Sequence, residues 1–286
     1  MARDSAIEWT DHTFNPWWGC TRVSPACKFC YAEAWSKRLG KQLWGKGAER
    51  RFFGEKHWRD PIKWNREAEH DGERRRVFCA SMADVFEDRD DLNPWRARLW
   101  PLIENTPWLD WQLLTKRPEH IGRFVPWHQD WPGNVWIGTT AEKQKWANKR
   151  IPELLQYPAA VRFVSCEPLL GPVNLTQWLA PLESRRARGR LNWVITGGES
   201  GARARPMNPA WAEALRDQCK EAGVPFHFKQ WGQWGPKNSS SPGTAQVIQM
   251  FDGSGRPIQL AKLGKKAAGR VLRGKTWDGF PTPIAA

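Results

Sequence analysis

Val161-Arg-Phe-Val-Ser-Cys-Glu-Pro168 is a short, largely apolar run that ends in polar residues. A strand buried on both faces has this pattern, because helices cover both sides of a parallel sheet. Similar runs recur through the first 231 residues, at spacings that leave room for a helix between them. They span residues 77–81, 108–114, 134–139, 191–196 and 224–228. Their recurrence predicts a parallel sheet.

Segments of helical character lie between these runs, at 94–102, 143–155 and 209–221. Two of them follow a capping residue, Asn93 or Asn208, with proline at the first helical position. Strand and helix therefore alternate. This pattern predicts an α/β fold, a partial or closed (β/α) barrel of the TIM type. A doubly wound open sheet is the alternative.

The predicted barrel spans residues 1–231 and contains a long insertion at about 32–76, rich in Trp, Arg and Lys. We expect the insertion to form a lid or a nucleic-acid contact. Residues 232–286 are predicted to form a flexible loop followed by a basic C-terminal extension. The loop is indicated by Gly, Pro and Ser over 235–243, and 258–273 predicts a short basic helix.

Polar residues follow the predicted strands, and both architectures place ligands at the carboxyl ends of their strands. Carboxylates there could hold an ammonium group or ribose hydroxyls, and adjacent glycines permit close approach of backbone to a ligand. A structural role, as a helix cap or a plain turn, is the alternative for each. The candidate cofactor-binding residues at strand ends are Asp84, Thr115, Thr139, Glu167, Gly197, Gly198 and Glu199.

Two further strand-end residues are candidate catalytic residues. Cys166 could donate a hydrogen atom in radical chemistry, with simple packing as its alternative role. Lys229 could hold a carboxylate or a phosphate. His12 is a candidate proton carrier or a structural histidine.

Three cysteines lie close together in Asn15-Pro-Trp-Trp-Gly-Cys-Thr-Arg-Val-Ser-Pro-Ala-Cys-Lys-Phe-Cys-Tyr31. Thiolate is the ligand that iron–sulfur clusters select, and three cysteines leave one iron of a 4Fe-4S cluster without a protein ligand. We therefore predict that Cys20, Cys27 and Cys30 bind such a cluster. A zinc site, which normally has four ligands, and unrelated buried thiols are the alternatives.

Lys and Arg together number 44 against 30 Asp and Glu, a formal net charge of +14, and the chain has 21 Trp. This excess favours binding to a polyanion, and nucleic acid is the natural partner. Solvated charge is the alternative for any single basic group. The candidate nucleic-acid-binding residues are Arg74, Arg75, Arg76, Arg185, Arg186, Arg188 and Arg190.

The first residues form no apolar signal segment, and no run of eighteen or more apolar residues occurs. We therefore expect a cytoplasmic protein without a membrane segment. Free cysteines are expected in that reducing compartment.

The cysteine motif resembles that of the radical S-adenosylmethionine (AdoMet) enzymes. In those proteins three cysteines bind a 4Fe-4S cluster, the fourth iron chelates the methionine part of AdoMet, and an aromatic residue before the last cysteine lies near the adenine. Phe29 matches that aromatic. The spacing departs from the commonest form, with six residues instead of three between Cys20 and Cys27. Gly-Gly-Glu at 197–199 resembles their motif for the methionine amino group, but it follows a late strand, so Asp84 is better placed.

Over nearly its full length the chain is similar to a phage-associated and bacterial three-cysteine-motif family of unknown function. The segments that carry this similarity are 9–20, 81–86, 114–118, 165–169, 194–200 and 264–270. The resemblance to radical AdoMet enzymes implies an enzyme that generates a 5′-deoxyadenosyl radical. The positive charge and the abundant Trp indicate that it modifies or rearranges a nucleic acid base or nucleotide, and phage association fits hypermodification of DNA. Repair of a DNA lesion and modification of RNA are open variants. Isomerase, lyase and transferase reactions all remain open.

The resemblances also imply an electron donor such as flavodoxin or ferredoxin, in the cytoplasm of a bacterium or a phage-infected host cell. The alternative function is a nucleic-acid-binding or repair protein in which zinc or a structural iron–sulfur cluster performs no radical chemistry. The sequence has no feature that indicates an oligomeric state.

Overall fold

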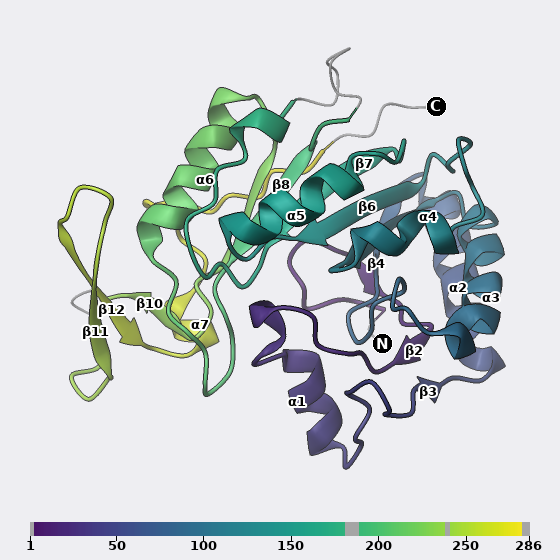
Figure 1. The fold of residues 1–286 in the computed structure, drawn as a ribbon, viewed down its shortest axis with the longest axis horizontal. Coiled ribbons are helices and arrows are strands. Elements are labelled where there is room, and N and C mark those ends of the chain that lie inside the picture. The colour runs from purple at the N-terminus through teal and green to yellow at the C-terminus, as the bar shows by residue number, and fades with distance from the viewer. Residues whose placement is uncertain (1–2, 181–188, 238–240, 282–286) are drawn as a thin grey trace. The chain divides into compact units, whose positions relative to one another are not determined.

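The computed structural model describes residues 3–180, 189–237 and 241–281, and its central feature is a parallel sheet of seven strands (Figure 1). The strand order is β1-β4-β5-β6-β7-β8-β9, which follows the chain without reversal. A doubly wound sheet reverses its strand order at a switch point, so this order supports the partial (β/α) barrel over the alternative. The strands are β1 (His12–Thr13), β4 (Arg75–Cys79), β5 (Leu109–Thr115), β6 (Val135–Thr140), β7 (Val161–Cys166), β8 (Trp193–Gly197) and β9 (Phe226–Gln230).

All six predicted apolar runs are strands, within two residues at each end, and all three predicted helices are present. Asn208 caps its helix as predicted, since its side chain accepts a hydrogen bond from the Ala210 amide, 3.0 Å away. The main helices are α2 (Glu55–Asp71), α3 (Asn93–Glu104), α4 (Ile121–Phe124), α5 (Gln144–Leu154) and α6 (Pro209–Glu221).

The described chain forms two compact units. The first comprises residues 3–139 and 152–162, and the second comprises 140–151 and 163–281 without the undescribed residues. Fully buried apolar side chains such as Leu99, Ile103 and Trp111 form the core of the first unit. Val194, Leu215 and Phe228 do the same in the second. The predicted division at residue 231 stays a prediction.

The predicted insertion at 32–76 divides into two parts. Its second part is α2, which connects the parallel strands β1 and β4 and therefore acts as an ordinary crossover helix of the sheet. The first part contains most of α1 (Tyr31–Arg38) and β3 (Arg51–Phe52), which pairs with β2 (Trp17–Trp18). Only this part departs from the alternation of strands and helices.

Residues 234–262 form an antiparallel sheet that the sequence analysis missed. It consists of β10 (Trp234–Pro236), β12 (Pro257–Lys262) and β11 (Val247–Phe251), in that order, packed around Ala204, Trp234 and Leu260. Because 257–262 pairs as β12, the basic helix expected over 258–273 is reduced to the short helix α7 (Lys265–Ala268). Residues 238–240 of the expected flexible loop lie outside the described residues.

The free edge of β9 is covered by residues near the C-terminus. Phe228 donates its amide to the carbonyl of Trp277 (2.9 Å), and Gly279 donates to the carbonyl of Phe226 (3.0 Å). An exposed strand edge invites pairing with other chains, and this segment prevents it here. No helix in the described ranges is long and apolar enough to cross a membrane.

The backbones that follow β8 and β9 approach closely, and Gly198 makes this possible. A Cβ atom on Gly198 would lie 1.9 Å from the carbonyl oxygen of Trp231. We therefore expect Gly198→Ala to lower the free energy of unfolding by about 1–3 kcal/mol, because the two backbones must separate. Urea unfolding at neutral pH measures this change.

Gly243→Ala is the matched control, because nothing lies within 4 Å of the Cβ atom that it would add. Its free energy of unfolding should stay within about 0.5 kcal/mol of that of the parent chain. Equal unfolding midpoints for the two variants would contradict the close approach.

Candidate functional site

The loop that carries the three cysteines is anchored to the carboxyl end of β4. The Gly19 amide donates to the carbonyl of Met82 (3.0 Å), and the Met82 amide donates to the side-chain oxygen of Asn15 (2.6 Å). Gly19 has φ of +116° and lies so close to Leu43 that a Cβ atom would come within 2.5 Å of its carbonyl oxygen. Glycine is therefore required directly before Cys20.

A buried ion pair joins this loop to the ends of β4 and β5. Arg117 Nη1 donates to Asp84 Oδ2 (2.8 Å) and to Cys20 Sγ (3.7 Å), and Arg117 Nη2 donates to the carbonyl of Thr21 (2.7 Å). Asp84 also accepts from Thr115 Oγ1 (2.7 Å) and from two backbone amides, those of residues 86 and 116 (3.1 Å each). Four donors thus occupy the Asp84 carboxylate, which anchors the two strand ends.

The charges of this pair are fixed by their surroundings. Burial raises the pKa of Asp84, but the Arg117 guanidinium and the hydrogen bonds outweigh it and hold the pKa below its ordinary value. Burial lowers the pKa of Arg117, but Asp84 and the other anionic neighbours outweigh burial, so the pKa lies above its ordinary value. Burial also raises the pKa of the Cys20 thiol to about 12, and Arg117 opposes this rise. A cation thus lies beside the first cysteine, where it favours the thiolate.

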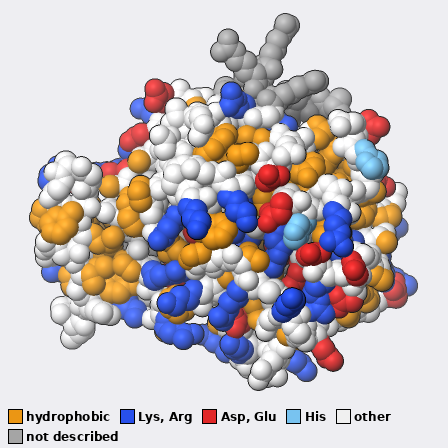
Figure 2. Space-filling view, viewed as in Figure 1, with side chains coloured by type: hydrophobic (Ala, Val, Ile, Leu, Met, Phe, Trp, Pro, Cys, Tyr) orange, Lys and Arg blue, Asp and Glu red, His pale blue; other side chains and the backbone are white. Residues whose placement is uncertain are grey.

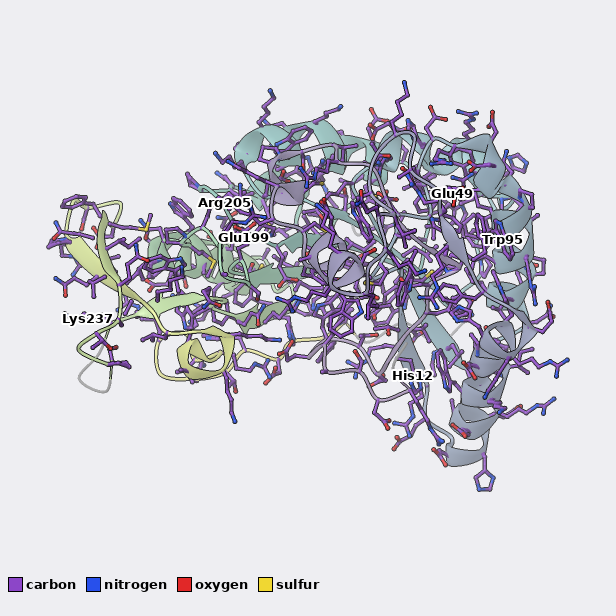
Figure 3. All side chains as sticks on the ribbon, turned by 90° about the horizontal axis from the view of Figure 1, so that it is seen from below. His12, Glu49, Trp95, Glu199, Arg205 and Lys237 are labelled. Atoms are coloured by element: carbon purple, nitrogen blue, oxygen red, sulfur yellow. The ribbon has the colours of Figure 1, made fainter. Side chains whose placement is uncertain are left out.

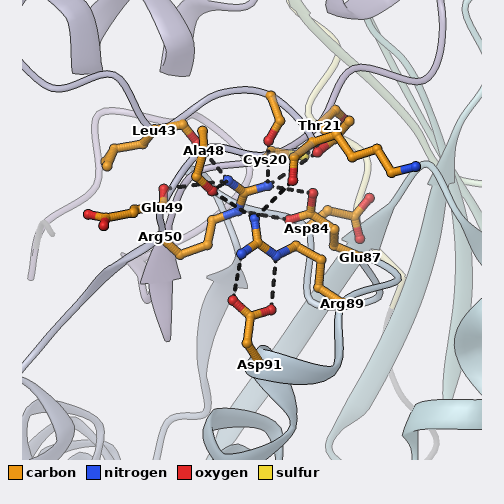
Figure 4. A network of polar contacts seen from close by, with 12 residues as sticks. Cys20, Thr21, Leu43, Ala48, Glu49, Arg50, Asp84, Glu87, Arg89 and Asp91 are labelled. Carbon is orange, nitrogen blue, oxygen red and sulfur yellow. Dashed lines mark hydrogen bonds and ion pairs between the residues drawn. The ribbon is translucent and has the colours of Figure 1, made fainter.

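A second buried ion pair, Arg50–Glu87, holds the other side of the loop (Figure 4). Arg50 donates to both Glu87 carboxylate oxygens, at 2.7 and 3.1 Å, and to Thr21 Oγ1 at 3.2 Å. It also donates to the carbonyls of Leu43 (3.0 Å) and Ala48 (2.7 Å). Residues 43–48 are thereby tied to the segment around Cys20.

The other two cysteines flank a short turn. Cys27 ends the 3-10 helix Pro25–Cys27, and Cys30 directly precedes α1. Burial raises the pKa of Cys30, while hydrogen bonds from the Ala32 and Glu33 amides in the first turn of α1 lower it. Arg22, which pairs with Glu33 at 2.6 Å, interacts electrostatically with Cys27 and Cys30.

The donor set fits a thiolate-bound cluster. All three cysteines are partly exposed, and each has a cation or a backbone amide near its sulfur. Within the described residues no three His, Cys, Asp or Glu side chains converge on one point that could hold a metal ion. A cluster bound by all three cysteines would therefore require their thiols to lie closer together than the structure places them.

The remaining candidates of the first unit have structural contacts. Thr139 Oγ1 donates to the carbonyl of Thr115 (2.9 Å), so the two threonines connect β5 and β6. Phe29 is half-buried, with Lys28 Nζ 5.3 Å from its ring centroid. His12 stacks on Trp64 at 4.5 Å between ring centroids and contacts the Arg3 carbonyl, as a structural histidine would.

In the second unit, three candidates meet at the ends of β7, β8 and β9. Lys229 Nζ lies 3.4 Å from Glu167 Oε1, and Ser165 Oγ donates to Glu167 Oε2 at 3.4 Å. A Cβ atom on Gly197 would lie 2.5 Å from Glu167 Oε1, so this glycine makes room for the carboxylate. Glu167, Gly197 and Lys229 thus form one polar group.

The other two candidates of the second unit, Glu199 and Cys166, are engaged or buried within the protein. Glu199 is engaged at both carboxylate oxygens by Arg205, at 2.8 and 2.5 Å (Figure 3). Cys166 is fully buried, and burial, with Cys219 of α6 and Glu167, raises its pKa well above the ordinary value. The roles of Glu199 and Cys166 with cofactor or substrate stay predictions.

Those predicted nucleic-acid contacts that lie among the described residues have partners within the protein. Arg74 pairs with Asp110 (2.5 Å), Arg75 with Asp71 (3.1 Å) and Arg76 with Asp11 (3.0 Å). Arg190 donates to the carbonyl of Gln177. Arg185, Arg186 and Arg188 lie outside the described residues.

The chain matches, over residues 4–281, a family model described as a protein of unknown function, DUF5131. The chain belongs to this family. No curated protein matches the chain. The DUF5131 chain is similar to spore photoproduct lyase complexed with dinucleoside spore photoproduct, at 11% identity and a TM-score of 0.47, covering 92% of this chain and 71% of that one. It is also similar to a double mutant of that lyase with bound AdoMet and dinucleoside spore photoproduct, at 10% identity and a TM-score of 0.42, covering 89% and 68%.

Removal of the Asp84 carboxylate should destabilise this DUF5131 protein strongly. Asp84→Ala leaves Arg117 buried without its counter-charge, so we expect the free energy of unfolding at pH 7 to fall by about 3–5 kcal/mol. The pKa of Asp84 is lowered in the folded chain, so its contribution is complete above about pH 4, the unfolded value, and is lost as pH falls through the folded pKa. Urea unfolding at pH 7 and at pH 3 should show a smaller difference between variant and parent at the lower pH.

Asp88→Ala is the control, because Asp88 pairs with Arg123 at the surface, where both side chains are more than half exposed. This variant should lower the free energy of unfolding by about 1 kcal/mol or less. A loss of similar size for both variants would contradict the anchoring role of Asp84.

Proposed function

We propose that the protein is a radical AdoMet enzyme that binds a 4Fe-4S cluster through Cys20, Cys27 and Cys30 and modifies or rearranges a nucleic acid base or nucleotide. The observation that carries this proposal is the anchoring of the cysteine loop on the carboxyl ends of β4 and β5. Ligand sites of α/β barrels lie at these ends. A loop that served only to connect elements would need neither buried ion pair.

The bound cluster and AdoMet together would supply a radical able to abstract hydrogen from an unactivated carbon. The chain's own part is to hold and tune the ligands. Arg117 donates an N–H to Cys20 and places a positive charge beside it, and the Ala32 and Glu33 amides do the same for Cys30 with backbone dipoles. Hydrogen bonds to cluster sulfurs and nearby charge are the levers by which a protein sets cluster potential.

Phe29, between Cys27 and Cys30 in the loop, is the proposed adenine contact. Asp84 is a less suitable ligand for the methionine ammonium than its position suggests, because four donors already occupy its carboxylate. The net charge of +14 supports a polyanionic substrate, and an electron donor such as flavodoxin or ferredoxin is proposed with it.

The test is anaerobic reconstitution of the whole chain with iron and sulfide. We expect about four irons per chain and formation of 5′-deoxyadenosine from AdoMet after reduction with dithionite. Replacing Cys20, Cys27 or Cys30 by Ala should abolish this cleavage and lower the iron content. Iron content and visible absorption report on the ligands independently of activity.

Cys219→Ala is the matched control, since Cys219 is a buried thiol of α6 that the proposal leaves out. It should keep the iron content of the parent chain. Stoichiometric zinc in a colourless protein, or full iron content in a Cys20, Cys27 or Cys30 variant, would overturn the proposal.

A further inference from the structure

Helix α1 presents an unusual exposed stripe. Tyr31 and Trp35 of this helix are 54% and 49% exposed, and Leu39, directly after it, is 47% exposed. Residues four apart lie on the same face of a helix, so the three side chains form one line. Tyr31 is fixed in this position, because its hydroxyl donates to the carbonyl of Ser81 at 2.7 Å.

This stripe belongs to a wider concentration of exposed apolar side chains. Nine large hydrophobic residues are exposed in the described chain, and five of them lie between residues 23 and 52. Besides the three of the stripe, they are Val23 and Phe52. A line of exposed apolar side chains on one helix face, such as Tyr31, Trp35 and Leu39, marks a binding site more often than scattered exposed residues do.

The same segment is strongly basic. Residues 22–52 contain eight Lys and Arg but two Asp and Glu. Arg22 and Lys37 pair with Glu33, and Arg50 pairs with Glu87. The other five are exposed and form no ion pair within the described residues: Lys28, Arg38, Lys41, Lys46 and Arg51. Figure 2 shows Lys and Arg side chains gathered over the place where Figure 1 draws α1.

We propose that this aromatic-basic surface, formed by Lys28, Tyr31, Trp35, Arg38, Leu39 and Lys41, binds a single strand of nucleic acid. Exposed indole and phenol rings can stack on bases, which a single strand presents and a duplex hides. The cations can contact the phosphates. Because α1 begins directly after Cys30, a strand bound there lies next to the cysteine loop. The role of this surface in presenting a substrate rests on the proposed function. Its binding of a single strand rests on the exposed rings and cations alone.

A second copy of this chain is a poorer occupant. A symmetric dimer through this face would bring the same unpaired cations of both copies together, because a twofold interface uses one patch twice. A polyanion instead neutralises them. The choice between the two follows from the charge of the surface.

The test measures binding of the full chain to a fluorescein-labelled, 20-nucleotide single-stranded DNA by fluorescence anisotropy. Trp35→Ala should weaken binding about tenfold, since stacking contributes about 1–3 kcal/mol per base. The double variant Arg38→Ala/Lys41→Ala should make the salt dependence of log K shallower by about 1.4, at about 0.7 per lost phosphate contact. RNA of the same sequence and the corresponding DNA duplex are parallel probes, and the duplex should bind more weakly than either single strand.

Two variants are matched controls. Phe251→Ala removes an aromatic side chain that is 56% exposed in the second unit, and Lys63→Ala/Arg66→Ala removes two exposed cations from α2. Both should bind the DNA as the parent chain does. Unchanged binding by Trp35→Ala, or equal losses in the controls, would overturn the inference, as would a dimer that Trp35→Ala dissociates in sedimentation while DNA binding persists.

The two measurements, DNA binding and iron uptake, can overturn the two proposals separately. Trp35-dependent binding in a chain that takes up no iron would overturn the proposed radical chemistry alone. Iron uptake and AdoMet cleavage with Trp35-independent binding would overturn this surface alone.

Discussion

The buried Asp84–Arg117 pair is the constraint on which the candidate site depends. Taking two charges out of water costs several kcal/mol per ion, and their attraction offsets this only when every remaining lone pair and proton is satisfied. The chain meets that condition with Thr115, two backbone amides, the Thr21 carbonyl and Cys20. These partners come from three segments, the cysteine loop and the residues at or after the ends of β4 and β5, so satisfying the pair also fixes the first cysteine at these strand ends.

The two ends of the cysteine loop are held differently. Around Cys20, both buried ion pairs and the bridge between Cys20 and Trp44 restrain the backbone. Around Cys27 and Cys30, the restraints are one turn of 3-10 helix, the first turn of α1 and the partly exposed Arg22–Glu33 pair. Fewer buried contacts mean a lower free energy of local opening. The side chains of Cys27 and Cys30 are therefore less restrained than that of Cys20.

The strands of the sheet could be predicted from sequence because burial on both faces leaves an apolar run such as 161–165, whatever the neighbouring elements are. The antiparallel sheet at 234–262 was missed although its signal was present: β11 and β12 flank Asp252-Gly253, a frequent hairpin dipeptide. The site was predictable only in part. The cysteine spacing and the strand-end position of Asp84 are local features. The Arg50–Glu87 pair joins residues 37 positions apart, and no local sequence pattern predicts such a contact.

Contacts between residues far apart in the sequence also decide which basic residues are left without an ion pair. Arg74, Arg75 and Arg76 form the densest run, but they lie at the start of a sheet strand, where Asp11, Asp71 and Asp110 come within ion-pair distance from neighbouring elements. A run of charges in a folded core region is compensated by the residues that surround it. Residues 22–52 contain only two carboxylates, and the five cations Lys28, Arg38, Lys41, Lys46 and Arg51 form no ion pair within the described residues. Density of positive charge along the sequence is thus a poorer guide to which cations lack an ion pair than the scarcity of nearby carboxylates.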